Sequence, residues 1–172
     1  MSLHSAVRGE ESELLRLQLS SRDFEDARDF IDAAKRHDAS TIEYAALVMT
    51  AIVCYARPFT KNELDPNSTV ASKLILDDPN SVLGPNIGLH NSVKRMRNKA
   101  VAHSESSHNP VQLVPVISGI GFLGRKWSLL EESIDIDVFR KIAETMRWYC
   151  INEIVALTAK EPASAERVHP TG

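Results

Sequence analysis

The residues best suited to chemistry lie close together between positions 94 and 103. Arg97 and Asn98 stand a few residues before His103, and three further cations accompany them: Lys94, Arg95 and Lys99. A histidine can serve as general acid or base because its pKa lies near neutrality. A guanidinium can neutralise the charge that builds on phosphate oxygens. Together these residue types could perform acid–base chemistry at a phosphate group.

The run Arg97-Asn98-Lys99-Ala100-Val101-Ala102-His103 resembles the Arg-(four to six residues)-His signature of HEPN domains, and Asn98 matches the polar residue that usually follows the arginine. HEPN domains are small helical domains, many of them metal-independent ribonucleases in toxin–antitoxin, abortive-infection and CRISPR systems. The resemblance therefore implies a metal-independent endoribonuclease, a hydrolase with no cofactor. It assigns catalysis to Arg97, His103 and Asn98, and RNA or phosphate binding to Lys94, Arg95 and Lys99.

The spacing of the two main residues favours a homodimer. Six residues of helix correspond to about 600° of rotation and about 9 Å of rise, so Arg97 and His103 point about 120° apart. One chain alone does not bring them together, whereas two copies related by a two-fold axis could. HEPN domains are known for paired motifs that line a cleft between subunits. The resemblance also implies RNA as substrate and an antitoxin or nucleotidyltransferase as partner.

Other interpretations of the same residues stay open. Arg97 could be a solvated helix charge and His103 a cap at the negative end of the helix dipole. The protein would then be a non-catalytic HEPN-like module that binds nucleotide, RNA or protein, or a helical interaction protein with an accidental motif. His103, Glu105 and His108 are spaced too loosely for a metal site, so no metal is predicted.

Composition and charge are those of one globular domain. The chain has 172 residues, 43% hydrophobic and 25% charged, with a net charge of −3, so any anion-binding surface must be local. Cys54 and Cys150 lie in apolar helical segments and are predicted to be buried thiols. The N-terminus has no apolar leader and no segment is predicted to span a membrane, which favours a cytoplasmic location.

Apolar periodicity predicts a mainly α-helical, up-and-down bundle of HEPN-like type. The expected helices cover residues 22–36, capped by Ser20-Ser21; 41–57, opened by a capping box of Ser40 and Glu43; 86–103; and 137–159, capped by Asp137. The helix at 41–57 is apolar nearly all round and is expected to be the most buried. A further short helix is predicted at Thr69–Leu76.

A change of character after Pro110 predicts a β-hairpin before the last helix. Its strands are expected at Val111–Ile117 and Phe122–Leu129, with a turn at Gly119-Ile120-Gly121. The domain organisation predicted from these elements is a partly ordered segment at 1–20, a helical domain at 21–160 with the hairpin at about 111–130, and a disordered tail at 161–172.

Overall fold

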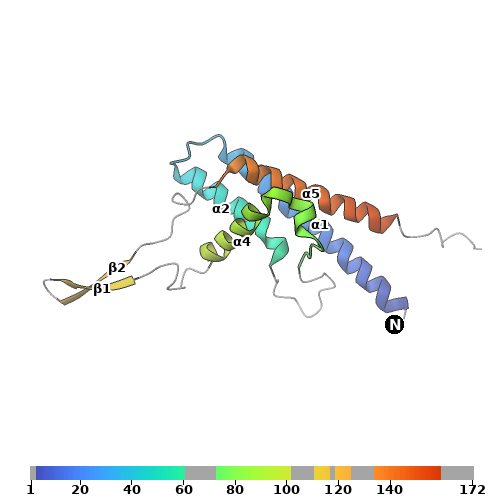
Figure 1. Ribbon diagram of the computed structural model, residues 1–172, viewed down its shortest axis with the longest axis horizontal. Helices are drawn as coiled ribbons and strands as arrows, with labels where there is room; N and C mark the ends of the chain where they lie inside the picture. Colours follow the sequence, from blue (N-terminus) through green and yellow to red (C-terminus); the bar gives the residue numbers. More distant parts are fainter. Residues whose placement is uncertain (1–2, 61–72, 102–110, 117–118, 125–133, 160–172) are drawn as a thin grey trace, which may run out of the picture.

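A computed structural model describes residues 3–60, 73–101, 111–116, 119–124 and 134–159 of the chain (Figure 1). The described part is a helical bundle. Its helices are α1 (Leu3–Ala34), α2 (Ile42–Ala56), α3 (Pro79–Leu83), α4 (Ile87–Val101) and α5 (Ile136–Thr158), with 3-10 turns η1 (Arg57–Phe59) and η2 (Gly84–Asn86). The predicted disordered tail and the predicted strand end beyond residue 124 lie outside the described residues.

Helix α1 is one continuous helix of 32 residues, so the helix start predicted at Ser20-Ser21 is wrong. The predicted boundary at residue 20 falls inside it. The reason is a heptad-like series of buried positions in which Ser20 takes part: Leu17, Ser20, Phe24, Ala27, Ile31 and Ala34. Alternating steps of three and four residues keep these side chains on one face, and α1 packs against both α5 and α2.

Helices α1 and α5 run antiparallel along the length of the bundle. Polar contacts join Arg28 to Glu144, Asp32 to Arg140 and Lys35 to Asp137, so residue numbers rise along one helix as they fall along the other. Figure 1 shows the N-terminus and the end of α5 at the same end of the molecule. The first helix of the chain is therefore held against the last.

Helix α2 packs on α1, and α4 packs on α2. The core between the four long helices contains mostly large apolar side chains, all nearly inaccessible: Phe24, Ile31, Ile52, Tyr55, Val93, Phe139, Ile142 and Met146. The buried thiols predicted from the sequence are confirmed, because Cys54 and Cys150 are both free and buried. Burial raises the pKa of both thiols, that of Cys150 to about 12.

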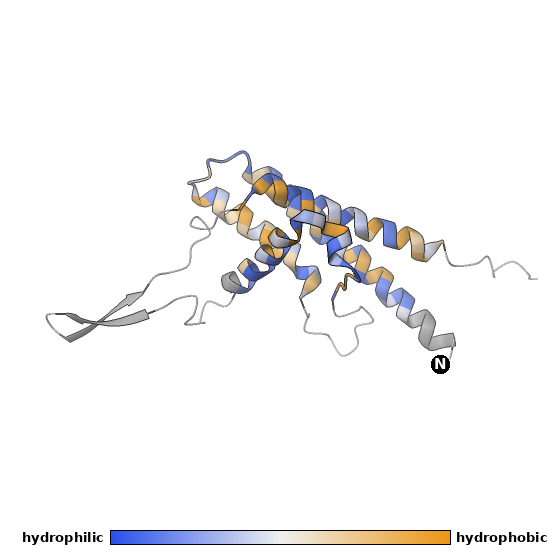
Figure 2. Cartoon of the chain, viewed as in Figure 1, coloured by the Kyte–Doolittle hydropathy of each residue, from blue (hydrophilic) through white to orange (hydrophobic). Residues whose placement is uncertain are grey.

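Helix α2, which was predicted to be the most buried, has six buried residues but also an open side. Ile52 is buried, but Leu47 and Val53 are half-buried and Ile42 is 79% exposed. Figure 2 shows that apolar residues continue along most of α2. One face of this helix is thus apolar and open to solvent.

The observed caps correct two predicted helix starts, and one predicted short helix is replaced by another. Thr41, not Ser40, caps α2 by accepting a hydrogen bond from the Tyr44 N–H, while Ser40 bonds to Asp38. Asp135, not Asp137, caps α5 by accepting from two backbone N–H groups. The short helix predicted at Thr69–Leu76 is not helical over residues 73–76, the described part of it, and α3 follows instead with Asp78 as its cap. In each case a neighbouring side chain reaches the free N–H groups better.

Two strands, β1 (Val111–Val116) and β2 (Gly119–Gly124), pair antiparallel, with Val111 opposite Gly124 and Val116 opposite Gly119. The turn predicted at Gly119-Ile120-Gly121 is therefore wrong, because these residues begin β2. Their backbone groups take part in the ladder, and the connection between the strands is shorter than the glycines suggested.

Candidate nucleic-acid site on helix α4

The predicted site lies on α4, which starts within one residue of its expected position. Gly84 leaves α3 with a φ of +52°, a conformation that glycine adopts without strain, and η2 then leads into the first turn of α4. The buried face of α4 carries His90, Val93 and Met96. These side chains lie at steps of three residues, as expected for a helix packed on one side.

His90 anchors α4 in the centre of the bundle. Its Nδ1 lies 2.8 Å from the Tyr55 hydroxyl, and its ring meets Phe59 edge-on with centroids 4.8 Å apart. Burial, with a smaller contribution from Lys94, lowers the pKa of His90 to about 4, and burial raises the pKa of Tyr55. At neutral pH the bond therefore joins two uncharged groups. Such a histidine positions a helix and is not exposed to a substrate.

The sequence analysis did not find this role for His90. The signal was present, because His90 lies three residues before Val93 on the apolar stripe of the helix. The His90 ring contacts Tyr55 at the end of α2 and Phe59 in η1. Tyr55 in turn contacts Phe24 on α1 and Phe139 on α5, so the aromatic cluster draws on four other elements. Sequence spacing alone does not reveal that these rings meet.

Lys94 and Arg95 occupy different environments on the outer side of α4. The Lys94 ammonium lies 5.1 Å from the centre of the Phe59 ring, and burial together with nearby Lys73 lowers the pKa of this lysine. Arg95 is exposed and donates a 2.8 Å hydrogen bond to the Ser92 hydroxyl. Lys94 is therefore held by the bundle, whereas Arg95 faces solvent.

Arg97 and Asn98 are brought together near the end of α4. Nη1 of Arg97 lies 3.4 Å from Oδ1 of Asn98, at the long end of hydrogen-bond distances. Arg97 is half-buried and Asn98 is exposed. Arg97 also follows His90 and Val93 by seven and four residues, so it continues the buried face toward its rim. His103 and the side chain of Lys99 lie outside the described residues, as does the pairing of Arg97 with His103.

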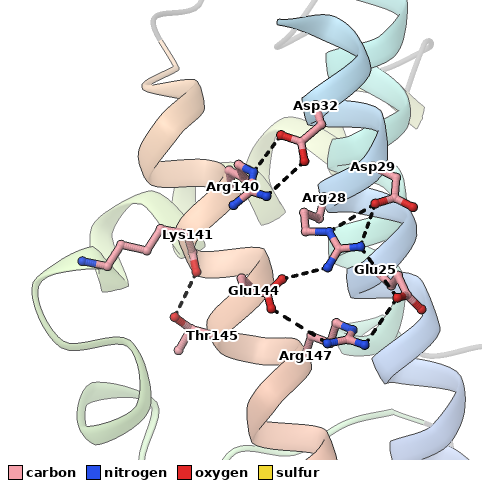
Figure 3. Close-up of polar contacts among 9 residues, drawn as sticks. All are labelled: Glu25, Arg28, Asp29, Asp32, Arg140, Lys141, Glu144, Thr145 and Arg147. Carbon is pink, nitrogen blue, oxygen red and sulfur yellow. Dashed lines mark hydrogen bonds and ion pairs between the residues drawn. The ribbon is translucent and has the colours of Figure 1, made fainter.

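A second polar cluster joins α1 to α5 and was not predicted (Figure 3). Arg28 donates to Glu144 at 3.1 Å, Arg140 donates to both oxygens of Asp32 at 2.7 and 3.1 Å, and Arg147 lies 3.4 Å from Glu25. The hydrogen bonds from Arg140 lower the pKa of Asp32. All these residues have partners across the helix pair, so the cluster acts as a structural connection.

Two grooves occur elsewhere on the described surface. A groove of about 800 Å³ follows the outer face of α5 and is lined by Lys141, Trp148 and their neighbours, with Trp148 51% exposed. A second groove, of about 410 Å³, lies between α1, α5 and residues 73–77. Neither groove is lined by Lys94, Arg95 or Arg97. Within the described part of the chain, the predicted site therefore lies on a helix surface outside both grooves.

Two properties of the described residues bear on other functions. No group of three or more histidine, cysteine, aspartate or glutamate residues in the described ranges could hold a metal ion. One helical stretch there, Ile42–Phe59, is long and apolar enough to cross a membrane by length and composition, with 39% of it buried within the fold. The prediction that no segment reaches that length is therefore wrong, although the core helix of a soluble protein meets the same criterion.

No family model, no curated protein and no solved structure matches this chain. The resemblance to HEPN domains therefore depends on the motif at residues 97–103 and on a helical bundle.

Proposed function

We propose that this protein is a metal-independent endoribonuclease of the HEPN type that acts in the cytoplasm as a two-fold dimer. The observation that carries the proposal is the contact between Arg97 and Asn98 on the last turns of a basic helix. An amide oxygen beside a guanidinium fixes its plane and leaves its other N–H groups free for phosphate. The proposed architecture is an up-and-down HEPN bundle with the β1–β2 hairpin inserted before α5.

In the proposed reaction the ribose 2′-oxygen attacks the adjacent phosphorus and the bond from phosphorus to the 5′-oxygen breaks. His103 takes the proton of the 2′-hydroxyl or supplies one to the leaving oxygen. Arg97 binds the phosphate oxygens as their negative charge increases, and Asn98 orients it. The products are a 2′,3′-cyclic phosphate and a 5′-hydroxyl. Lys94, Arg95 and Lys99 attract the RNA backbone, and an antitoxin or nucleotidyltransferase is the proposed partner.

The test is cleavage of single-stranded RNA in excess EDTA. Wild-type protein is expected to cut and to leave cyclic phosphate ends. Arg97→Ala is expected to lower the rate by about a hundredfold or more, since the charge on the phosphate loses its main partner. His103→Ala is expected to abolish cleavage, and Asn98→Ala to reduce it less than Arg97→Ala.

Arg95→Ala is the matched control because Arg95 is an exposed arginine on the same helix, bonded only to Ser92 among the described contacts. Arg95→Ala and Lys99→Ala are each expected to weaken RNA binding and to reduce the salt dependence of that binding. Neither should lower the cleavage rate as much as Arg97→Ala does. Equal losses in Arg95→Ala and Arg97→Ala would contradict a specific role for Arg97. Undiminished cleavage in His103→Ala would remove the motif from the mechanism.

A helical interaction module is the second candidate, favoured by the exposed apolar face of α2. Folded wild-type protein that cuts no RNA would support it over the ribonuclease.

A further inference from the structure

The exposed face of α2 carries a continuous apolar stripe. Its members are Ile42, Ala46, Met49 and Val53, at steps of four, three and four residues, which place them along one side of the helix. Ile42 is 79% exposed, Ala46 is exposed, and Met49 and Val53 are half-buried. The stripe extends about 16 Å, since eleven residues separate its ends. Water contact along such a surface is unfavourable, and a partner that covers it is expected.

The stripe is self-complementary when two copies of α2 pair antiparallel. A two-fold axis near the middle of the stripe places Ile42 of one copy beside Val53 of the other, and Ala46 beside Met49. The small alanine leaves room for the long methionine, and this alternation of small and large residues lets two helices approach closely. A parallel pair would instead place Met49 against Met49 and Ala46 against Ala46.

Charges at the two ends of the stripe favour the same arrangement. Asp38 and Glu43 lie exposed at the N-terminal end of α2. Arg57 lies at its C-terminal end, where it is 49% exposed and also donates to Asp23 of its own chain at 2.6 Å. Antiparallel pairing brings Arg57 of one copy opposite Asp38 of the other. Parallel pairing would bring like charges together at both ends.

We infer that the α2 stripe is the surface through which two copies of this chain pair, antiparallel and about a two-fold axis. The occupant is a second copy because both the sizes and the charges of the stripe match the stripe itself. The α2 stripe would thus be the interface of the dimer proposed above. Only the dimeric state is taken from the proposed function. One helix pair is smaller than a standard interface of about 1,600 Å², so we expect a dissociation constant of about 1–100 µM.

Sedimentation equilibrium of the full chain between about 1 and about 200 µM tests the inference. Wild-type protein is expected to move from monomer to dimer over this range. Ala46→Glu and Ile42→Glu are each expected to weaken the dimer by about thirtyfold or more, because they place a charge within the apolar contact. Both positions are exposed, so circular dichroism and thermal unfolding are expected to show an intact fold.

Val155→Glu is the matched control, because Val155 is 59% exposed on α5 and lies away from the stripe. The Val155→Glu protein should dimerise as wild type does. A wild-type monomer throughout the range would overturn the inference. Flotation of the wild type, but not of Ala46→Glu, with phosphatidylcholine–phosphatidylglycerol vesicles would overturn it too, because the occupant would then be a lipid surface.

Disulfide trapping tests the antiparallel arrangement. Ala46→Cys and Met49→Cys proteins, mixed and oxidised with diamide, are expected to form the mixed disulfide in preference to either symmetric one. The native thiols Cys54 and Cys150 are buried and should not compete. Preferential Ala46→Cys homodimers would contradict the antiparallel pair.

RNA cleavage by the same preparations separates this inference from the proposed activity. A wild-type dimer that cuts no RNA would retain the interface and overturn the ribonuclease. A wild-type monomer that cuts RNA would overturn both the interface and the proposed dimer, and would retain only the cleavage chemistry.

Discussion

His90 shows how one buried residue makes the stability of the bundle depend on pH. The unfolded chain gains a proton on this histidine as the pH falls below its ordinary pKa of 6.5, whereas in the folded protein burial lowers that pKa to about 4. Between these values the unfolded state binds more protons, so the free energy of unfolding decreases as the pH falls. Above pH 6.5 the contribution is constant.

We predict a loss of about 3 kcal/mol from His90 between pH 6.5 and pH 4, measured by urea unfolding at each pH. His90→Gln is the comparison because glutamine does not titrate and its carbonyl can still accept from the Tyr55 hydroxyl. The variant should have a flatter stability profile in this window than wild type. Identical slopes in the two proteins would show that His90 does not supply the pH dependence.

Ser20 makes a second prediction at the residue scale. Its hydroxyl oxygen is buried and has no hydrogen-bond partner among the described residues. Ser20→Ala removes this unsatisfied group and places a better helix former within α1, so we expect a gain of about 0.5–1.5 kcal/mol in the free energy of unfolding. Thermal unfolding measures it, with Ser12→Ala at a half-buried position of the same helix correcting for helix propensity. A less stable Ser20→Ala protein would indicate an unseen partner for the hydroxyl.

At the scale of elements, the polar cluster between α1 and α5 predicts unequal effects of similar substitutions. Glu144 is 30% exposed and contacts Arg28 and Arg147 in the helix pair. Glu144→Gln should cost about 1–2 kcal/mol, because it removes the carboxylate that the partly buried Arg28 and Arg147 share and leaves them with their remaining partners on α1, Glu25 and Asp29. Asp29→Asn makes the same chemical change at a residue that is 63% exposed and contacts Arg28 within α1.

Asp29→Asn should cost less than about 0.5 kcal/mol, since exposed pairs contribute little. Urea unfolding at low and high salt provides the measurement, and the difference between the variants should decrease as salt increases. Equal losses in the free energy of unfolding would mean that the ion pairs between α1 and α5 stabilise the fold no more than an exposed ion pair within α1.

The helices could be predicted from the sequence because their apolar faces repeat locally. The start of α4 and the extent of α2 follow from that periodicity within one residue. The continuity of α1 could not be predicted from residue preferences, since Ser20-Ser21 is typical of a cap. Tertiary packing decided that position, because Ser20 falls in the buried series with Leu17 and Phe24.

At the scale of the molecule, contacts between sequence neighbours could be predicted from the sequence, whereas contacts between distant residues could not. The adjacency of Arg97 and Asn98 was already given by their order in the chain. The bond between Tyr55 and His90 joins residues 35 apart, and that between Arg28 and Glu144 joins residues 116 apart. Such contacts depend on which helices become neighbours, and no local pattern specifies that.

The antiparallel contact of the first helix with the last has a consequence for biosynthesis. While the ribosome is still translating residues before Ile136, α2 can already pack on α1, but the part of α1 that α5 covers in the finished bundle stays open. Closing a loop of about a hundred residues is entropically costly, so docking of α5 comes late in folding. A nascent chain stalled before α5 should therefore be sensitive to protease and should bind chaperones through α1. Once α5 has been synthesised and has left the ribosome, both properties should disappear together.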